Sequence, residues 1–259
     1  MKLIVLFLLL VLPMAMRAQP MPIDTDRPDQ TESAFLVPKG WLQFEMGFNK
    51  HGGNQYFPEE RLLPTLLSKY GINKRIELRL ITTVQSVKAY TPAKGNYWES
   101  GLQPVEVGAK LHIAQAKGWL PQTALIFHFA LPKVASVSKR INRLAPNFRF
   151  TMQNSITDAM AIGYNLGAEW DGFSNTPAWI YTFAPGFKIG ESWYGYIEAF
   201  GSVMKNEKPQ HSVDAGIAWY ASDDVKIDFS GGKALNNYVQ PWYMAVGISA
   251  RLQVSKKKN

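Results

Sequence analysis

The chain has 259 residues and no cysteine, which excludes a disulfide framework, a thiol nucleophile and any cysteine-based metal site. Its formal net charge of +8 comes partly from a C-terminal SKKKN tail, and no basic run is interleaved with aromatic residues, so we expect no nucleic-acid partner. A chain of this length can form one large domain without cross-links.

The N-terminus carries Lys2, an apolar run from Leu3 to about Met16, and the small residue Ala18. This pattern predicts a secretory signal peptide over residues 1–18, cleaved after Ala18. The alternative is a membrane-anchoring helix, but the run is shorter than the roughly 20 residues that span a bilayer. No other window of the sequence is long and apolar enough for a transmembrane helix.

A polar lead-in over residues 19–40 comes next, with DTDRPDQTES at its centre. After it, alternation with a period of two organises almost the whole sequence, and no stretch reads as an amphipathic helix. About twelve segments have strand character: roughly 41–49, 61–70, 75–87, 103–113, 119–131, 147–156, 159–170, 178–189, 193–204, 211–220, 224–230 and 242–253.

The links between these strands alternate in length. Short links such as GINK and SDD alternate with longer Gly-, Pro- and Asn-rich links such as KAYTPAKGNYWESGL. Such alternation is typical of an up-and-down meander through a membrane, with tight turns at one end and larger loops at the other. A soluble sandwich has frequent turns but gives no reason for this alternation.

The strands are apolar on one face only. In the segment IELRL, Ile76, Leu78 and Leu80 alternate with Glu77 and Arg79. A soluble sandwich could bury such apolar faces in a core, but six of the eight tryptophans lie at strand ends, like the aromatic girdles of transmembrane barrels. We expect these aromatic residues at the membrane interface: Trp41, Trp119, Trp170, Trp179, Trp193, Trp219 and Trp242.

The sequence therefore predicts an all-β fold, a closed antiparallel up-and-down transmembrane β-barrel of about 12 strands over residues 41–254. A charged C-terminal tail, residues 255–259, follows it. Closure is required because an open sheet in lipid would leave unpaired backbone groups along its edges.

With the apolar faces on lipid, the polar faces would line a lumen. Seven acidic and seven basic residues are expected there: Glu45, Arg75, Glu77, Arg79, Glu106, Lys110, Arg149, Glu169, Lys188, Glu198, Asp214, Lys226, Asp228 and Arg251. A strongly ion-selective pore would show an excess of one sign, so this balance favours cross-strand ion pairs and a narrow, ligand-specific or partly closed channel. Alternatively, these charges only hydrate and brace the wall. Twelve strands leave open whether solute passes.

No enzyme signature is evident. The four histidines are scattered, with no pair at metal-ligand spacing. His128 could act as a base beside a serine, but an isolated strand histidine is more often packed or lumenal. We expect no catalytic residues, no metal and no cofactor.

The segment DTDRPDQTESAFLVPKGWLQFEMGF, residues 24–48, resembles the opening of the phenol meta-pathway degradation family of bacterial outer-membrane barrels. The shared features are TDRPD, from Thr25 to Asp29, and a P-K-G-aromatic-x-Q-x-E first strand from Pro38. The resemblance implies an outer-membrane channel for small solutes, aromatic or hydrophobic compounds among them, and supplies no catalytic or substrate residues. One departure is that ARLQV is followed by SKKKN, where this class of barrel ends on an aromatic residue.

Two roles are open for the lead-in. In the first, it forms an ordered periplasmic lip that caps the first strand, with its Asp and Thr side chains bonding turn backbone. Alternatively, Asp26, Arg27, Asp29 and Glu32 fold into the barrel mouth, pair with lumenal Arg or Lys and make a constriction. We favour the lip.

Three functions are in view, of which transport of small solutes across the cell outer membrane of a Gram-negative bacterium is favoured. A structural or adhesive barrel would act through its surface loops, such as KVASVSKRINRLAP. An outer-membrane lipid hydrolase would need a serine beside a histidine. The expected partners are outer-membrane lipid, a small-molecule solute and the barrel-assembly machinery, while the oligomeric state is left open.

Overall fold

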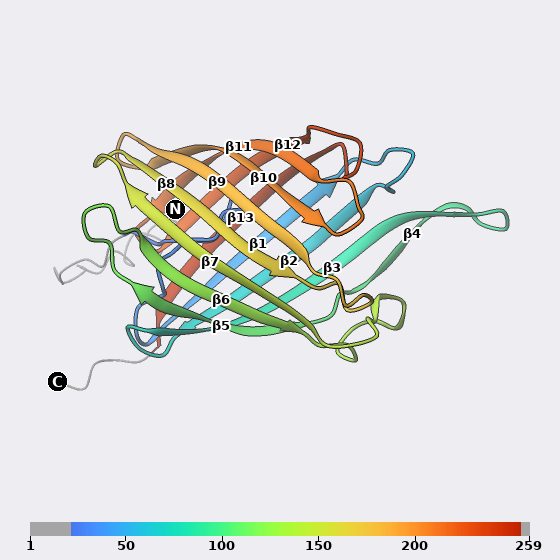
Figure 1. Cartoon of the computed structure of the whole chain (residues 1–259), viewed down its shortest axis with the longest axis horizontal. Coiled ribbons are helices and arrows are strands. Elements are labelled where there is room, and N and C mark those ends of the chain that lie inside the picture. Colours follow the sequence, from blue (N-terminus) through green and yellow to red (C-terminus); the bar gives the residue numbers. More distant parts are fainter. Residues whose placement is uncertain (1–21, 255–259) are drawn as a thin grey trace, which may run out of the picture.

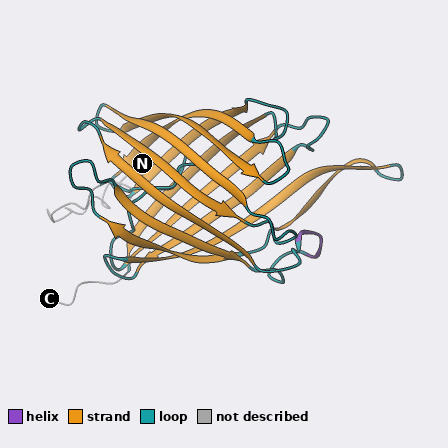
Figure 2. Cartoon of the chain, in the orientation of Figure 1, coloured by secondary structure: helices purple, strands orange, loops and turns teal. Residues whose placement is uncertain are grey.

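A computed structural model of the protein describes residues 22–254. The predicted signal peptide, residues 1–18, and the charged tail, residues 255–259, lie outside the described residues. The described chain is almost entirely strand and loop (Figure 2). Its elements are β1 (Trp41–His51), β2 (Glu60–Gly71), β3 (Ile76–Thr91), β4 (Gly95–Leu102), β5 (Glu106–Ala114), β6 (Gln122–Ala130), the short 3-10 helix η1 (Val137–Lys139), β7 (Ala145–Ser155), β8 (Met160–Glu169), β9 (Ala178–Ile189), β10 (Trp193–Met204), β11 (Gln210–Ser222), β12 (Val225–Ala234) and β13 (Trp242–Gln253).

Twelve of these strands form a closed antiparallel barrel. From β5 to β13 each strand pairs with the next one along the chain, while β3 pairs with both β2 and β5. The ring closes where β1 pairs with β13, in a register that runs from Trp41 opposite Gln253 to His51 opposite Tyr243. The predicted all-β, up-and-down, closed antiparallel barrel is therefore confirmed, and its twelve strands leave no open sheet edge.

The strand β4 was not predicted. It pairs with the second half of β3, from Thr91 opposite Gly95 to Val84 opposite Leu102. Together they form a hairpin that projects beyond one end of the barrel (Figure 1). The prediction of a loop in this region was wrong because the turn residues are confined to the tip, where Gly95 has a φ of +67°.

Several predicted strand starts also differ from the structure, among them those at 103, 119 and 75. The strand predicted over 119–131 begins at Gln122, because Lys117 and Leu120 exchange backbone hydrogen bonds in a tight turn before it. Arg75 was placed in a strand and on the lumen face. It lies instead in the exposed turn before β3, where its N–H donates to the Asn73 side chain at 2.7 Å.

The predicted alternation of short and long links holds at every pair except β5–β6, where the predicted short link runs from 115 to 121 and is as long as the β12–β13 link. The turns β2–β3, β7–β8, β9–β10 and β11–β12 are short and gather at the end of the barrel where β1 begins and β13 ends (Figure 1). Longer links and the β3–β4 hairpin occupy the other end. At the short-turn end Trp193 stacks on Trp219, with ring centroids 6.3 Å apart, while Trp242 begins β13 at the opposite end. Contact of the tryptophans with a membrane interface stays a prediction.

The outward face of the barrel is apolar. Leu78 and Leu80 on β3 are exposed, while their neighbours Glu77 and Arg79 are buried on the inner side. The same pattern holds on the later strands, where Phe229 and Met244 face outward. A water-soluble surface rarely exposes a continuous apolar band of this kind, so this outer face suits lipid. Among residues 22–254, no helix has the length and apolar character needed to cross a membrane.

Candidate functional site: a segment folded into the lumen

Residues 22–39, called the plug from here on, form no strand and fold into the barrel. Their side chains and backbone bond residues on nine strands: β1, β2, β3, β5, β7, β8, β9, β10 and β12. The favoured prediction of a lip over the first strand is therefore wrong. A lip would bond turn backbone, whereas this segment bonds inward-facing side chains around most of the ring.

The barrel wall supplies hydrogen-bond acceptors for the backbone N–H groups of the plug. A buried segment without a strand partner must satisfy its N–H groups by other means. Here wall side chains accept them, at 2.7 to 3.0 Å: Asp26 N–H donates to Glu45, Gln30 N–H to Glu198, Glu32 N–H to Asn165 and Val37 N–H to Glu77. The acceptor side chains on the inner face of the barrel are thus positioned to match the backbone N–H groups of the plug.

One side of the lumen, called the basic wall, carries Lys69 on β2, Arg79 on β3 and Lys110 on β5, all buried. Their cationic groups converge on the carboxylate of Asp26. Lys69 Nζ and Arg79 Nη1 lie 2.9 Å from Oδ2, and Lys110 Nζ lies 3.0 Å from Oδ1. Burial raises the pKa of Asp26, but Lys110, Lys69 and Arg79 outweigh it and hold that pKa well below its usual value.

The three cations differ in what else they contact. Lys69 also pairs with Glu45, and Arg79 also pairs with Glu77, at 3.1 Å. Within residues 22–254, Lys110 Nζ contacts plug atoms only: the Asp26 carboxylate and the carbonyl oxygens of Ser33 and Phe35, at 2.8 and 3.3 Å. The plug is therefore the source of all the neutralising partners of this buried ammonium.

A second plug carboxylate strengthens the same side. Glu32 lies 2.6 Å from Arg79 Nη2 and 3.9 Å from Arg149 Nη1, and Arg149 also pairs with Glu169. Burial raises the pKa of Glu32, but Arg79 and Arg149 lower it overall. Arg79 Nε donates to His128 Nε2 at 3.0 Å, so that nitrogen is an acceptor occupied by an arginine.

The opposite side, called the acidic wall, carries Glu198 on β10, Asp214 on β11 and Asp228 on β12. Arg27 of the plug forms a two-point contact with Asp228, at 2.9 Å through Nη2 and 3.4 Å through Nε. A bidentate contact of this kind fixes the orientation of the arginine side chain and is also stronger than a single hydrogen bond.

Two glycines make room for the Arg27 guanidinium. Gly47 on β1 and Gly247 on β13 are directly opposite each other in the sheet. A Cβ atom on Gly47 would lie 2.1 Å from Arg27 Nη1, and one on Gly247 would lie 2.3 Å from Nε. The wall is thus shaped for this arginine as well as charged for it.

Further along the plug, Thr31 Oγ1 lies 2.6 Å from Glu198 Oε1 and 2.6 Å from Thr182 Oγ1. Burial and the charge of Glu198 raise the pKa of Asp29 well above its usual value. Lys226 Nζ donates to the Arg27 carbonyl oxygen at 2.5 Å. The acidic wall thus holds the plug through one ion pair, the Lys226 ammonium and the uncharged donors of Gln30 and Thr31.

Eight of the fourteen residues expected in the lumen bond the plug: Glu45, Glu77, Arg79, Lys110, Arg149, Glu198, Lys226 and Asp228. The others lie elsewhere. Glu169 pairs with Arg149, Asp214 accepts from Tyr243, and Arg251 pairs with Asp224 at 2.8 Å. Glu106 lines a cavity, whereas Lys188 is exposed near the end of β9 and Arg75 is exposed in its turn.

Sequence reasoning missed Lys69, Asn165 and most of the plug contacts. The segment LLPTLLSKY around Lys69 is apolar on both sides, so alternation could not assign that lysine to a face. Asn165 is uncharged and was outside a search for charges. The spacing of Lys69 from the following turn was the one available signal.

A cavity of 570 Å³ lies at the long-loop end of the lumen. Its lining combines the acidic residues Glu60 and Glu106 with the apolar residues Leu62, Ile141 and Trp170. The inward faces of β3 and β5, which line this cavity, also carry Arg79 and Lys110 of the basic wall. Among the described residues, no group of three or more His, Asp or Glu side chains is placed to hold a metal ion.

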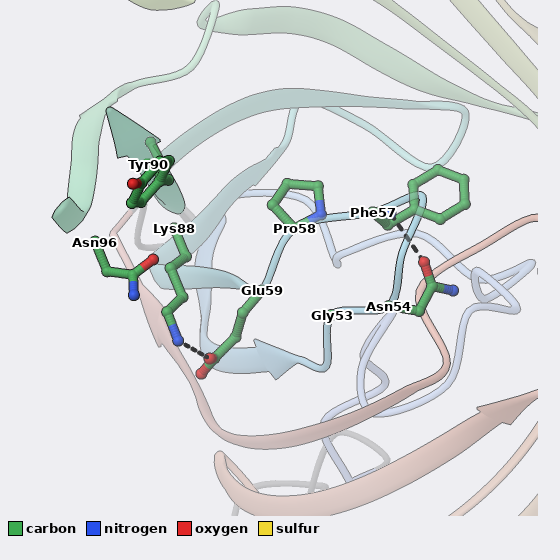
Figure 3. Close-up of a pocket in the computed structure, with 9 residues that line it drawn as sticks. Gly53, Asn54, Phe57, Pro58, Glu59, Lys88, Tyr90 and Asn96 are labelled. Atoms are coloured by element: carbon green, nitrogen blue, oxygen red, sulfur yellow. Dashed lines mark hydrogen bonds and ion pairs between the residues drawn. The ribbon is translucent and has the colours of Figure 1, made fainter. Parts of the chain in front are cut away.

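A second, smaller cavity of 340 Å³ lies between the outer half of the β3–β4 hairpin and the β1–β2 loop (Figure 3). Lys88 and Glu59 point toward each other there, 3.6 Å apart, with Tyr90 beside them (Figure 3). It involves no plug residue, and it separates the hairpin from the β1–β2 loop.

Residues 25–252 match the family described as "Putative MetA-pathway of phenol degradation". The chain belongs to this family. The match covers the plug from residue 25 onward and reaches into β13, so most of the segment inside the lumen is part of the family pattern together with the barrel around it. A comparison with curated protein sequences finds no match.

Solved structures share the fold at low sequence identity. An outer-membrane channel from Pseudomonas putida F1 aligns with a TM-score of 0.63 at 10% identity, covering 85% of this chain and 98% of that one. The NanC porin aligns at 0.54 and 10% identity, covering 82% and 100%. The CymD monoaromatic hydrocarbon channel aligns at 0.50 and 10% identity, covering 85% and 90%. At this identity the likeness extends to the barrel fold alone.

Proposed function

We propose that the protein is a channel of the bacterial outer membrane that passes small solutes, aromatic compounds among them, and that the plug closes it at rest. The observation that carries this proposal is a polar lumen crossed by a segment of the same chain, held by side-chain contacts to nine strands. A plug held this way can leave without disturbing the strand ladder.

The apolar outer face supports a location in lipid, and the fold shared with outer-membrane channels supports the outer membrane. Residues 1–18 would direct export from the cytoplasm of a Gram-negative cell and then be removed. The barrel-assembly machinery and the surrounding lipid are the partners that insertion requires.

The cavity at the long-loop end supports small solutes as cargo. Its volume of 570 Å³ falls within the range of about 300–1,000 Å³ for small-molecule sites. Its mixed lining, with Trp170 and Ile141 beside Glu106, suits compounds that combine a ring with a polar group. The inward-facing charges expected from the sequence would line the rest of the path.

Planar-bilayer conductance tests the channel directly. We expect the mature chain to conduct in rare, small steps and a variant lacking residues 22–37 to conduct steadily, because the deletion removes the obstruction and spares every strand. A variant shortened at the hairpin tip, without residues 92–95, is the matched control and should behave like the mature chain. A plug-deleted barrel that is folded and inserted yet silent would contradict the channel.

A second candidate, adhesion through surface loops, is favoured by one observation. The β3–β4 hairpin projects past the barrel end (Figure 1), and Tyr90 near its tip is 69% exposed. Loss of cell-surface binding in the hairpin variant, with conductance unchanged, would support this role.

A further inference from the structure

We propose that the Asp26 carboxylate occupies a binding site for the carboxylate group of a transported solute, so that such a solute opens the channel by taking the place of Asp26. This inference rests on the proposed channel function and names the class of solute: small organic acids. It assigns the basic wall a recognition role.

The site has the geometry of a carboxylate receptor. Three cationic groups from three different strands, β2, β3 and β5, lie within 3.0 Å of the two oxygens of one carboxylate. Lys69 and Arg79 share Oδ2, while Lys110 and the Ser33 N–H bond Oδ1. Charge-assisted hydrogen bonds of this kind are about twice as strong as neutral ones. Lys69 and Arg79 are also held by Glu45 and Glu77 of the wall, so these two cations keep wall partners whether or not the plug is docked.

Departure of the plug would leave one cation uncompensated. Lys69 would keep Glu45, and Arg79 would keep Glu77. Lys110, which is buried while the plug is in place, would lose every partner it has among the described residues. Its ammonium would then face the emptied lumen with water in place of an ion pair. A solute carboxylate bound at Lys110 would replace the lost ion pair, and so would stabilise the open state.

The cavity and the site lie along the same strand faces. Thr83 on β3 and Glu106 on β5 line the long-loop cavity. Arg79 and Lys110 lie four residues further along the same inward faces, about 13 Å away at the rise of a strand. A small acid in the cavity would therefore approach the basic wall along β3 and β5 once the plug moves.

A thiol reporter can follow the plug. The chain has no cysteine, so Ile23→Cys would carry the only thiol, at a plug position that is 1% exposed and occupied by a larger side chain. Maleimide labelling of the inserted mature chain then measures how often the plug leaves. Sodium benzoate is compared with benzamide, its neutral isostere, and with sodium chloride at the same ionic strength.

We expect benzoate to raise the labelling rate by about tenfold, the value of one charge-assisted hydrogen bond, and benzamide and chloride to leave it unchanged. An equal response to benzamide, or no response to benzoate, would overturn the inference.

Two variants locate the effect. Lys110→Gln and Lys226→Gln each remove one ammonium that bonds the plug, on opposite walls. Each raises the basal labelling rate, so the ratio with and without benzoate is compared. In Lys110→Gln, benzoate should no longer change the labelling rate, so the ratio should fall to about one. In Lys226→Gln the ratio should stay as it is in the unmodified plug. A ratio preserved in Lys110→Gln would overturn the assignment. Failure here with a conducting plug-deleted barrel contradicts the inference alone, whereas a silent plug-deleted barrel contradicts the channel.

Discussion

The two walls of the lumen hold the same plug by different means. On the basic wall, three cations from three strands meet the single carboxylate of Asp26. On the acidic wall, Arg27 meets the single carboxylate of Asp228, and the remaining contacts come mainly from hydroxyl and backbone donors. On the first side the plug presents carboxylates, Asp26 and also Glu32, to buried cations, whereas on the second side one arginine contact is joined by hydroxyl and backbone donors.

The difference rests on two adjacent residues. Asp26 and Arg27 are consecutive in the plug, yet Asp26 bonds the basic wall and Arg27 bonds Asp228 on the acidic wall. One dipeptide therefore fixes both the rotation and the depth of the segment. Because the walls have opposite charges, only one sign order fits.

Exchanging the two residues tests this most severely. The variant Asp26→Arg with Arg27→Asp has the same composition and net charge, yet it places an arginine against three cations and a carboxylate against Asp228. We expect the plug to stay outside the lumen and the barrel to conduct as steadily as the plug-deleted chain. A closed channel in this variant would show that the charge order does not position the plug.

Neutralising one carboxylate at a time should show which wall contributes more to holding the plug in the lumen. Asp26→Asn leaves three buried cations facing an amide, a loss of about 3–5 kcal/mol for a broken buried pair and hence more than about a hundredfold in plug release. Asp228→Asn leaves Arg27, whose side chain is 16% exposed and partly solvated, so we expect about tenfold. Labelling rates of the Ile23→Cys reporter measure both, and equal rates would contradict the ranking.

Steric fit on the acidic side gives a smaller effect. Gly47→Ala would place a Cβ atom inside the Arg27 guanidinium, at 2.1 Å, so the arginine must shift and weaken its contact with Asp228. We expect reporter labelling to rise about fivefold to tenfold, less than or equal to the Asp228→Asn effect. Gly231→Ala is the matched control, since its nearest neighbour would be 3.4 Å away. Equal labelling in the two alanine variants would remove the steric role.

The sequence predicted the barrel better than its contents. Alternation placed Glu77 and Arg79 on one face because each strand repeats a two-residue period over many residues. The plug has no period, and its decisive contact joins Asp26 to Lys110, which are 84 residues apart. That contact exists only once the ring has closed. The β3–β4 hairpin was missed for a local reason. Pro92 and Gly95 indicate a turn, and the whole segment around them was therefore interpreted as a loop.

The smallest expected effect is a pH dependence confined to the acidic wall. Burial and Glu198 raise the pKa of Asp29 well above its usual value, with Asp214 adding to the shift and Lys226 opposing it. The docked plug therefore binds a proton more tightly than the released plug, so docking is stronger at low pH and weakens as pH rises through the docked pKa. Asp26 has the opposite shift, and its contacts persist until pH falls well below the usual aspartate range.

We therefore expect the Ile23→Cys reporter to label a few-fold faster as pH is raised from the ordinary aspartate range to pH 8, after correction for the reactivity of the thiol with a free cysteine peptide. Asp29→Asn should reduce this difference, because an amide beside Glu198 does not ionise. The same correction applies to both chains, so their ratio isolates the plug. An unchanged pH dependence in Asp29→Asn would assign it to another group on the acidic wall and would leave the basic wall as the part of the lumen that fixes plug position at every pH.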